Sequence, residues 1–301
     1  MARTIIYFGA ILALAAAAAV GRASLRPIAE SADGADGANG ALRHPPRRIA
    51  SLSPSTTELC AALGLTDRLV ARSRYCDWPP TILEVPPVGG LLDLDVERLV
   101  AARPDLVLLP GRSQAQRDAL SRTGLRFVSL PDSALEDVFV SLEQLGRLAG
   151  VDAEAAAVIA RIRHELDGLT RSSRPARPLG VLLVVERLQL PPTRVYVAGP
   201  GSYLDRLLRL AGHENAMASL GRVWGEVGLE EVLLADPDAI IEFPSDARVD
   251  DLQAVRDGWA KVGAMNAVRS NRVFVLAGQQ HTVPGPRVAD TLRAIVELLR
   301  R

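Results

Sequence analysis

The sequence is poor in aromatic residues and cysteine and carries no net charge, and each shortage narrows what the protein can be. Basic and acidic residues number 35 each, so the formal net charge at pH 7 is zero. This balance argues against nucleic acid as the main partner, because such proteins carry a basic surplus. Of the basic residues only Lys261 is lysine, which we interpret as a bias in genome composition. With 301 residues, 48% of them hydrophobic, the chain is long enough for two domains with sizeable cores.

The motifs of common enzymes are missing as well. The sequence has no G-x-S-x-G, no phosphate-binding P-loop and no G-x-G-x-x-G after a predicted strand. Its four histidines, His44, His164, His213 and His281, do not cluster, which argues against a zinc-type site. We therefore expect a protein that is not an enzyme and has no resident metal or cofactor.

Two cysteines, Cys60 and Cys76, leave two alternatives. Outside the cytoplasm they can form a disulfide. The other interpretation is two separate thiols, because Cys60 falls on the apolar face of a predicted helix and Cys76 in a loop. Their spacing in the sequence does not decide between these.

The N-terminus predicts export. Arg3 precedes an uncharged apolar run over Ile5–Val20. At about 16 residues the run is short for a membrane span and suits a signal peptide. We predict a signal peptide over residues 1–24, with an uncleaved membrane anchor as the alternative, and a flexible linker over 25–46. The protein is then periplasmic or otherwise extracytoplasmic.

One segment occurs twice. The stretch VERLVAARPDLVLL at Val96–Leu109 returns without a gap as LEEVLLADPDAIIE at Leu229–Glu242. Each copy predicts a short amphipathic helix, an Ala-x-Pro-Asp turn and an apolar strand. Two such copies favour two similar α/β lobes with a ligand cleft between them.

The rest of the chain follows the same alternation of strands and helices. We expect two Rossmann-like lobes with mostly parallel sheets, over 47–134 and 175–301, joined by a long rigid helical segment over 135–174. The predicted strands are Arg48–Ser53, Leu69–Ser73, Leu106–Leu109, Phe127–Leu130, Leu179–Val185, Val195–Ala198, Ala239–Phe243 and Val273–Leu276. The main predicted helices are Glu58–Leu63, capped by Thr56 or Thr57, Val96–Ala102, Gln114–Thr123, Leu135–Ala149, Ala153–Leu169, Tyr203–Leu210, Leu229–Leu234, Asp251–Trp259 and Arg287–Leu299.

Loops that follow parallel strands line the ligand crevice in sheets of this kind. Four segments are predicted there: Ser53–Ser55, Arg74–Gly90, Gly221–Gly228 and Gly278–Gly285. They hold a large share of the scarce aromatic side chains, which suit a planar ligand, together with polar groups that would orient it. The candidate ligand-binding residues are Ser53, Tyr75, Trp78, Trp224, Gln279 and His281. For any one of them, ordinary packing beneath a long loop is the alternative.

The repeat also aligns two acids, Glu97 and Glu230. Asp95 and Gly228 are predicted helix N-caps, so each Glu falls in a first turn, where the helix dipole stabilises an acid by ~0.3–1 kcal/mol. That alone can explain both acids. The functional alternative is that they receive basic residues of a partner protein and orient its docking.

Several segments together resemble a known family: IASLSPSTTEL, SRYCDWPP, VGG ahead of VERLVAARPDLVLL, YVAGPGSYLDRLLRLAG, W-x4-LEEVLLADPDAII and GPRV. They resemble the iron-siderophore and cobalamin periplasmic-binding proteins of ABC importers over about Arg47–Arg301. The likeness is closest to the cobalamin-binding members, because of YCDWPP and the Trp six residues before the second-lobe Glu.

The resemblance implies roles for individual residues. Glu97 and Glu230 match the acids that dock on a permease dimer, and Tyr75 and Trp224 match aromatic contacts to the corrin ring. Trp78 stands where the family often has Tyr. The last loop, Ala-Gly-Gln-Gln-His-Thr-Val, departs from the acidic and basic pair of some cobalamin binders, which leaves the ligand open.

Four functions remain as alternatives. The first is a monomeric, extracytoplasmic substrate-binding protein that delivers a corrinoid to an ABC permease. The second is the same scaffold serving an iron-siderophore or haem, with Tyr75 or His281 able to ligate iron. The third is an enzyme, which fold alone does not exclude. The fourth is a membrane-anchored ligand sensor.

Overall fold

The structure is a computed structural model, and it describes residues 44–111, 113–173, 175–187, 189–244 and 252–300. The predicted signal peptide or anchor and nearly all of the predicted linker lie outside the described residues. Within the described residues, no helix is both long and apolar enough to span a bilayer. The chain forms two compact units: the first runs to Asp132 and includes Asp137–Ile159, and the second contains Ser133–Glu136 and Ala160–Arg301.

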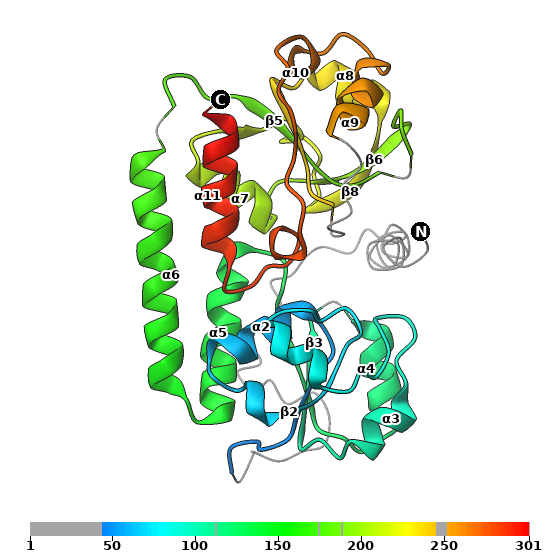
Figure 1. The fold of residues 1–301 in the computed structure, drawn as a ribbon, viewed down its shortest axis with the longest axis vertical. Helices are drawn as coiled ribbons and strands as arrows, with labels where there is room; N and C mark the ends of the chain where they lie inside the picture. Colours follow the sequence, from blue (N-terminus) through cyan, green and yellow to red (C-terminus); the bar gives the residue numbers. More distant parts are fainter. Residues whose placement is uncertain (1–43, 112, 174, 188, 245–251, 301) are drawn as a thin grey trace. The chain divides into compact units, whose positions relative to one another are not determined.

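The first unit is built on a four-stranded parallel sheet in the order β2-β1-β3-β4. Helices cover both sides of this sheet (Figure 1). The apolar side chains of α3 and α4 pack on one side against alternate residues of β1 and β3. The elements are β1 (Ile49–Ser51), α2 (Pro54–Ala62), β2 (Leu69–Arg72), α3 (Val96–Ala101), β3 (Leu106–Pro110), α4 (Gln114–Leu120) and β4 (Phe127–Leu130), with 3-10 turns at Thr66–Arg68 and Pro80–Glu84.

The second unit has a mixed sheet in the order β10-β9-β5-β6-β8, with β7 paired to β5. Strands β10, β9 and β5 are parallel, whereas β6 runs antiparallel to both β5 and β8. Its elements are β5 (Gly180–Arg187), β6 (Arg194–Ala198), α7 (Tyr203–Leu210), β7 (Glu214–Asn215), β8 (Trp224–Gly228), α8 (Leu229–Ala235), β9 (Ala239–Glu242), α9 (Leu252–Ala260), α10 (Asn266–Arg269), β10 (Val273–Val275), a 3-10 turn (Gln279–His281) and α11 (Val288–Leu299).

Two long helices follow the first sheet along the chain. Helix α5 (Leu135–Ala149) carries a strongly one-sided apolar pattern, and α6 (Asp152–Ser172) continues without a break for 21 residues. The division between the two units falls within both helices.

The predicted loop Gly221–Gly228 is wrong, because Trp224–Gly228 forms the edge strand β8. Gly225 and Gly228 within this segment suggest a loop, since glycine has a low β propensity. In the folded unit, however, β6 offers unpaired backbone groups, and β8 satisfies them from Arg194↔Gly228 to Ala198↔Trp224. The side chain of Arg222 lies over Gly225, where an added Cβ would approach its Nε to 2.1 Å.

The predicted start of the first helix at Glu58, with Thr56 or Thr57 as its cap, is also wrong. Helix α2 begins at Pro54, and Ser53 is the N-cap, whose Oγ accepts from the Thr56 N–H at 3.2 Å. Proline favours the first turn of a helix, where no intrahelical N–H donor is needed. The serine therefore caps the helix and the proline begins it.

The two copies of the repeat have the same local structure. Arg103 and Asp236, at equivalent positions, both adopt a left-handed backbone at φ 46° and 38°, which ends the helix ahead of the proline. The left-handed residue, the proline and the aspartate that follows it thus occupy equivalent positions in both units. The aspartate anchors the turn to the sheet.

That acid is Asp105 in the first unit and Asp238 in the second. Asp105 accepts hydrogen bonds from the N–H groups of Arg47 and Arg48 at 2.9 and 3.0 Å, and Asp238 accepts from Gly180 N–H at 3.0 Å. In both cases the carboxylate holds the start of the unit's first strand. The repeat therefore encodes a structural module in each unit.

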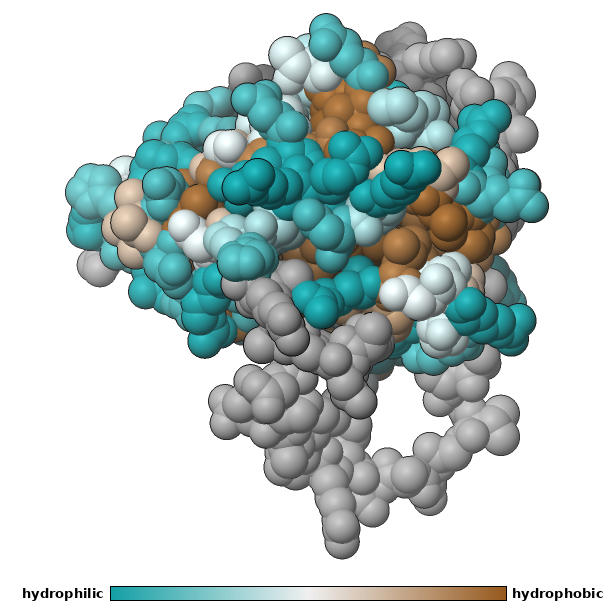
Figure 2. All heavy atoms as spheres, turned by 90° about the horizontal axis from the view of Figure 1, so that it is seen from below, coloured by the Kyte–Doolittle hydropathy of each residue, from teal (hydrophilic) through white to brown (hydrophobic). Residues whose placement is uncertain are grey.

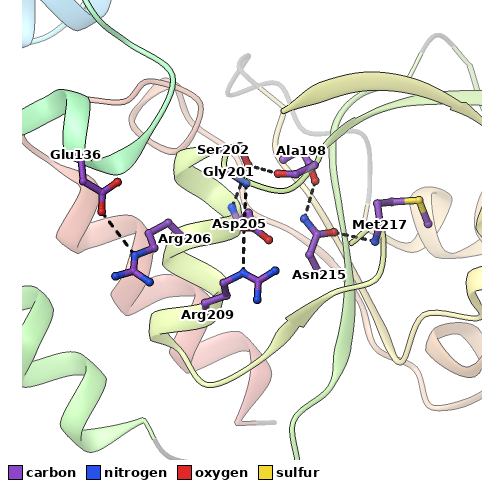
Figure 3. Close-up of polar contacts among 10 residues, drawn as sticks. Glu136, Ala198, Gly201, Ser202, Asp205, Arg206, Arg209, Asn215 and Met217 are labelled. Atoms are coloured by element: carbon purple, nitrogen blue, oxygen red, sulfur yellow. Dashed lines mark hydrogen bonds and ion pairs between the residues drawn. The ribbon is translucent and has the colours of Figure 1, made fainter. Parts of the chain in front are cut away.

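A polar network fixes the start of α7 (Figure 3). Ser202 caps the helix by accepting from the Asp205 N–H at 3.1 Å, and Asp205 accepts from Gly201 N–H and from Arg209 Nε at 3.2 and 3.0 Å. Asn215 ties the preceding strand to this region by donating to the Ala198 carbonyl at 2.9 Å. The sequence GPGSY therefore fixes Tyr203 as the first residue of α7.

The face of the molecule drawn in Figure 2 carries mainly hydrophilic side chains with apolar patches between them. Among the described residues, the exposed large hydrophobic side chains include Leu83, Leu92 and Val100 in the first unit and Leu233 and Leu234 in the second. Two of these five, Val100 and Leu233, occupy equivalent positions of the repeat.

Candidate functional site

In the first unit, Ser53 belongs to a cluster of buried hydroxyl groups at the end of β1. Its Oγ lies 2.9 Å from both Ser55 Oγ and Thr56 Oγ1, and Ser51 Oγ lies 2.7 Å from Thr56 Oγ1 and from Thr57 Oγ1. Ser53 is only 3% exposed. Its hydroxyl thus serves the helix cap and this network.

Both cysteines are free, buried thiols, so the separate-thiol interpretation is confirmed. The Thr57 hydroxyl donates to Cys76 Sγ at 3.0 Å. Burial raises the pKa of each thiol to about 12. Because the thiolate is the reactive form, both cysteines are chemically inert in this environment.

The Arg72 side chain anchors the loop that carries Tyr75 and Trp78. This buried guanidinium donates to the carbonyl oxygens of Ser73 and Cys76 at 3.1 Å and of Val85 at 2.9 Å. The loop is therefore anchored at three points of its backbone. Both aromatic side chains remain half-buried at the surface of the unit.

The ring of Tyr75 lies directly over Gly90. A Cβ at Gly90 would come within 2.7 Å of Tyr75 Cε2 and 2.8 Å of Asp93 Oδ1. Asp93 also accepts from the Gly90 N–H at 3.1 Å and pairs with Arg74 at 2.5 Å. The absence of a side chain at Gly90 therefore allows the tyrosine ring to approach the backbone closely.

In the second unit, Trp224 stands at the start of β8 and contacts Tyr203. Their ring centroids are 5.8 Å apart with the planes inclined by 49°. Tyr203 is 2% exposed, whereas Trp224 is half-buried, so the indole keeps part of its surface free of the unit's core. The Tyr203 hydroxyl donates to the His281 carbonyl at 2.9 Å, which links two of the predicted site residues through a third side chain.

The His281 ring is buried at 6% exposure, and both of its nitrogens are engaged. Nδ1 lies 3.0 Å from Thr291 Oγ1, which itself donates to the Gln280 carbonyl, so Nδ1 acts as the donor. Nε2 lies 3.2 Å from the Gln280 amide nitrogen and accepts from it. Burial, reinforced by the positive charge of Arg287, lowers the His281 pKa to about 4, while Asp290 opposes this shift.

Gln279 occupies the first position of the same 3-10 turn and is half-buried. The structure thus brings Trp224, Gln279 and His281 into one region of the second unit, around Tyr203. In the first unit it brings Ser53, Tyr75 and Trp78 to the ends of β1 and β2.

Glu97 and Glu230 lie in the first turns of α3 and α8, as predicted. Asp95 caps α3 by accepting from the Arg98 N–H at 3.0 Å, and Gly228 N–H donates to Glu231 at 2.9 Å at the start of α8. The helix starts are thus capped by Asp95 and Glu231, the neighbours of Glu97 and Glu230 in the sequence. Glu97 and Glu230 themselves are exposed.

Two side chains of this region were not predicted from the sequence. Tyr203 was assigned only to a helix, although the sequence GPGS immediately before it marks a fixed loop beside a strand. Glu186, at the end of β5, is half-buried, with its Oε2 atom fully buried. An acid near the end of an otherwise apolar strand is the signal that identifies it.

Within the residues that the structure describes, no three His, Cys, Asp or Glu side chains gather in a way that could hold a metal ion. What each unit presents instead is a set of aromatic and neutral polar side chains on loops or edge strands. Aromatic and neutral polar side chains of this kind commonly line the binding sites of small molecules.

Comparison with known proteins identifies the family. A model of the family described as "Periplasmic binding protein" matches residues 49–279, so the chain belongs to that family. It is a binding protein and not an enzyme. The chain is 26% identical over 264 residues to an uncharacterized ABC transporter substrate-binding lipoprotein, YvrC, of Bacillus subtilis, covering 85% of this chain and 81% of that protein. It is 27% identical over 209 residues to the vitamin B12-binding protein of Yersinia pestis, covering 69% of this chain and 73% of that one.

Solved structures share the fold. The periplasmic vitamin B12-binding protein BtuF of Vibrio cholerae superposes with a TM-score of 0.70 at 24% identity, covering 85% of this chain and 98% of that one. A periplasmic haem-binding protein from Pseudomonas aeruginosa gives 0.69 at 26% identity, covering 83% and 91%. An ABC-type Fe3+-hydroxamate transport protein from Saccharomonospora viridis gives 0.70 at 25% identity, covering 89% and 98%. The predicted α/β fold is therefore confirmed, with one parallel and one mixed sheet.

Proposed function

We propose that this substrate-binding protein of an ABC importer binds cobalamin or a related corrinoid outside the cytoplasm and delivers it to the permease. The observation that carries the proposal is the pair of aromatic surfaces, Tyr75 in the first unit and Trp224 in the second, each held by the fold with part of its ring surface exposed. Flat apolar rings of this kind suit a macrocycle.

The supports of the two rings differ in kind but have the same effect. Tyr75 is fixed against the backbone of Gly90, and Trp224 is fixed against the buried ring of Tyr203. A preordered aromatic side chain loses little conformational entropy when a ligand binds. We propose that both rings contact one ligand, with Trp78 and Gln279 at the border of the binding site.

The state of His281 argues against its use as a ligand to the metal of a bound molecule. Its ring is buried, and both nitrogens already have partners within the second unit. The cobalt of cyanocobalamin brings its own ligands, so the protein need not supply one. We therefore assign His281 to the support of the 3-10 turn that carries Gln279.

Docking on the permease is the second part of the proposal. Glu97 and Glu230 are exposed acids at equivalent positions. Within the described residues, neither side chain forms a hydrogen bond or an ion pair. One helical turn further on, each helix exposes an apolar side chain, Val100 at 44% and Leu233 at 40%. The same acidic and apolar pair in both units fits a permease dimer with two equivalent basic sites.

A second candidate, haem, is favoured by one observation. Tyr75 stands on an anchored loop with its ring half-buried, and a tyrosine oxygen is a known axial ligand of haem iron. In that case the haem complex would show the absorption spectrum of tyrosinate-ligated ferric iron, and Tyr75→Phe would abolish it.

The test is calorimetric titration of the purified full chain with cyanocobalamin, with hemin and ferrichrome as parallel ligands. Tight one-to-one binding of cyanocobalamin alone supports the proposal. Heat with hemin or ferrichrome and none with cyanocobalamin would refute the corrinoid assignment and leave the family assignment intact.

Docking is tested separately by uptake. The double variant Glu97→Arg with Glu230→Arg should abolish ligand uptake by cells that depend on this importer, while the dissociation constant stays within about twofold. The matched control is Glu143→Arg with Glu154→Arg, which changes the same amount of charge at exposed positions of α5 and α6. Loss of uptake in both double variants would show that general charge, and not docking at these sites, is responsible.

A further inference from the structure

Glu186 lies on the same face of the second sheet as Trp224. Residues directly opposite one another in antiparallel strands point to the same face, and Glu186 is paired with Tyr196, which is paired with Glu226 on β8. Trp224 is two residues before Glu226, so it points the same way. The register alone therefore places the carboxyl group and the indole on one face.

The opposite face is a closed hydrophobic core. Val195 and Val227, which alternate with Tyr196 and Glu226, pack there with the fully buried Trp259. Val184 packs there too, because the register shifts at a β-bulge between Val184 and Glu186 and so places these two residues on opposite faces. Glu242 also belongs to that face, since it accepts from Trp259 Nε1 at 2.7 Å and from Arg187 Nε at 2.8 Å. The charge of Arg187 is thus committed to Glu242 on the other side of the sheet from Glu186.

Within the described residues, no ion pair compensates the Glu186 carboxyl in this way. Its Oε2 atom is buried and has no hydrogen-bond partner within the described part of the chain. The charged groups on its own face, Arg194 of β6 and Glu226 of β8, form an ion pair with each other. Burial without a counter-charge raises the Glu186 pKa to about 7. A buried, unpaired carboxyl is costly, and it is uncommon unless something else satisfies it.

The distance to the proposed ligand contact suits a large molecule. Two residues along β8 span about 7 Å and two steps between strands span about 10 Å, which separates the Cα atoms of Glu186 and Trp224 by roughly 12 Å. A corrin ring with its amide side chains covers such a distance. One molecule that rests on Trp224 can therefore reach Glu186 with its periphery.

We infer that Glu186 is a specificity-determining ligand contact that receives a neutral amide group at the edge of the bound molecule. This inference rests on the proposed function. A primary amide satisfies the side chain in either charge state, because its C=O accepts from the protonated carboxyl and its N–H donates to the carboxylate. An anionic edge, such as the carboxylates of haem, offers no donor and is repelled once Glu186 ionises.

Two variants of the full chain separate this role from a structural one, with cyanocobalamin as the probe. Glu186→Gln keeps a donor and an acceptor and should bind within about threefold of the wild type at pH 7. Glu186→Met has similar length and no polar group, so its affinity should fall about tenfold, which corresponds to one lost hydrogen bond. Circular dichroism and thermal unfolding check that both variants fold.

A different result for Glu186→Met would contradict a role in binding. If Glu186 is only an uncompensated buried carboxyl with no role in binding, Glu186→Met should bind cyanocobalamin as tightly as the wild type and be more stable. That result would overturn the inference. Failure of the wild type itself to bind cyanocobalamin would refute the proposed function, and with it the contact inferred here.

A measurement without ligand tests the environment of the carboxyl. An acid whose folded-state pKa is raised adds stability below its unfolded pKa near 4.5 and loses it as pH rises to about 7. The wild type should therefore lose stability relative to Glu186→Gln between pH 4.5 and 7. Parallel profiles for the two proteins would show that the carboxyl is not buried as described and would overturn the inference.

Discussion

The buried imidazole of His281 makes a quantitative prediction about stability at acid pH. Replacing it by asparagine, His281→Asn, keeps a side-chain N–H donor for Thr291 and removes the titrating ring. Because the folded-state pKa is lowered from 6.5 to about 4, the folded protein resists the protonation that the unfolded chain accepts. The stability that the neutral ring contributes is complete above pH 6.5 and is lost as pH falls towards 4.

The size of the effect follows from the two pKa values. Each unit of difference corresponds to about 1.4 kcal/mol, so the full shift is worth at most about 3.4 kcal/mol. At pH 5 the unfolded state is almost fully protonated and the folded state is not, and the loss is about 2 kcal/mol. At pH 4, where the folded ring is half-protonated, the loss rises to about 3 kcal/mol.

The assay is urea unfolding of both proteins from pH 4 to pH 8. The difference in free energy of unfolding between the wild type and His281→Asn isolates this ring from all other titrating groups. His164→Asn is the matched control, since His164 is exposed on α6, and it should leave the profile unchanged. A wild-type profile that runs parallel to that of His281→Asn between pH 6.5 and 4 would refute the reasoning about burial.

Three further predictions concern the candidate site and the docking acids. Trp224→Ala should raise the dissociation constant for cyanocobalamin at least about tenfold, as for a lost aromatic anchor, and Trp224→Phe should recover most of it; an unchanged constant would remove Trp224 from the site. Tyr203→Phe keeps the ring contact and removes the hydroxyl that donates to the His281 carbonyl, so urea unfolding at pH 7 should show a loss of about 1–2 kcal/mol. Charge reversal at Glu97 and Glu230 should stop uptake without changing affinity, and a collapse of affinity would instead assign both acids to ligand binding or folding.

Local patterns in the sequence were sufficient for the general architecture. The periodicity of apolar residues distinguishes helices from strands, and the alternation of the two predicts α/β units. The repeat over Val96–Leu109 and Leu229–Glu242 even predicts a common turn, because a proline after a helix and an acid next to it act through neighbouring backbone. The N-cap Asp95 could be identified for the same reason, since a cap contacts groups only three residues away.

Only the tertiary structure decided which distant groups meet. Trp224–Gly228 has the composition of a loop, and it becomes a strand because β6 presents backbone groups that must be paired. Tyr203 gains its place between Trp224 and His281 from contacts 21 and 78 residues away in the sequence (203 to 224, and 203 to 281). Glu186 is unusual because of the partners it lacks within the described chain, and the absence of a partner is a property of three-dimensional packing that no spacing of residues in a sequence can express.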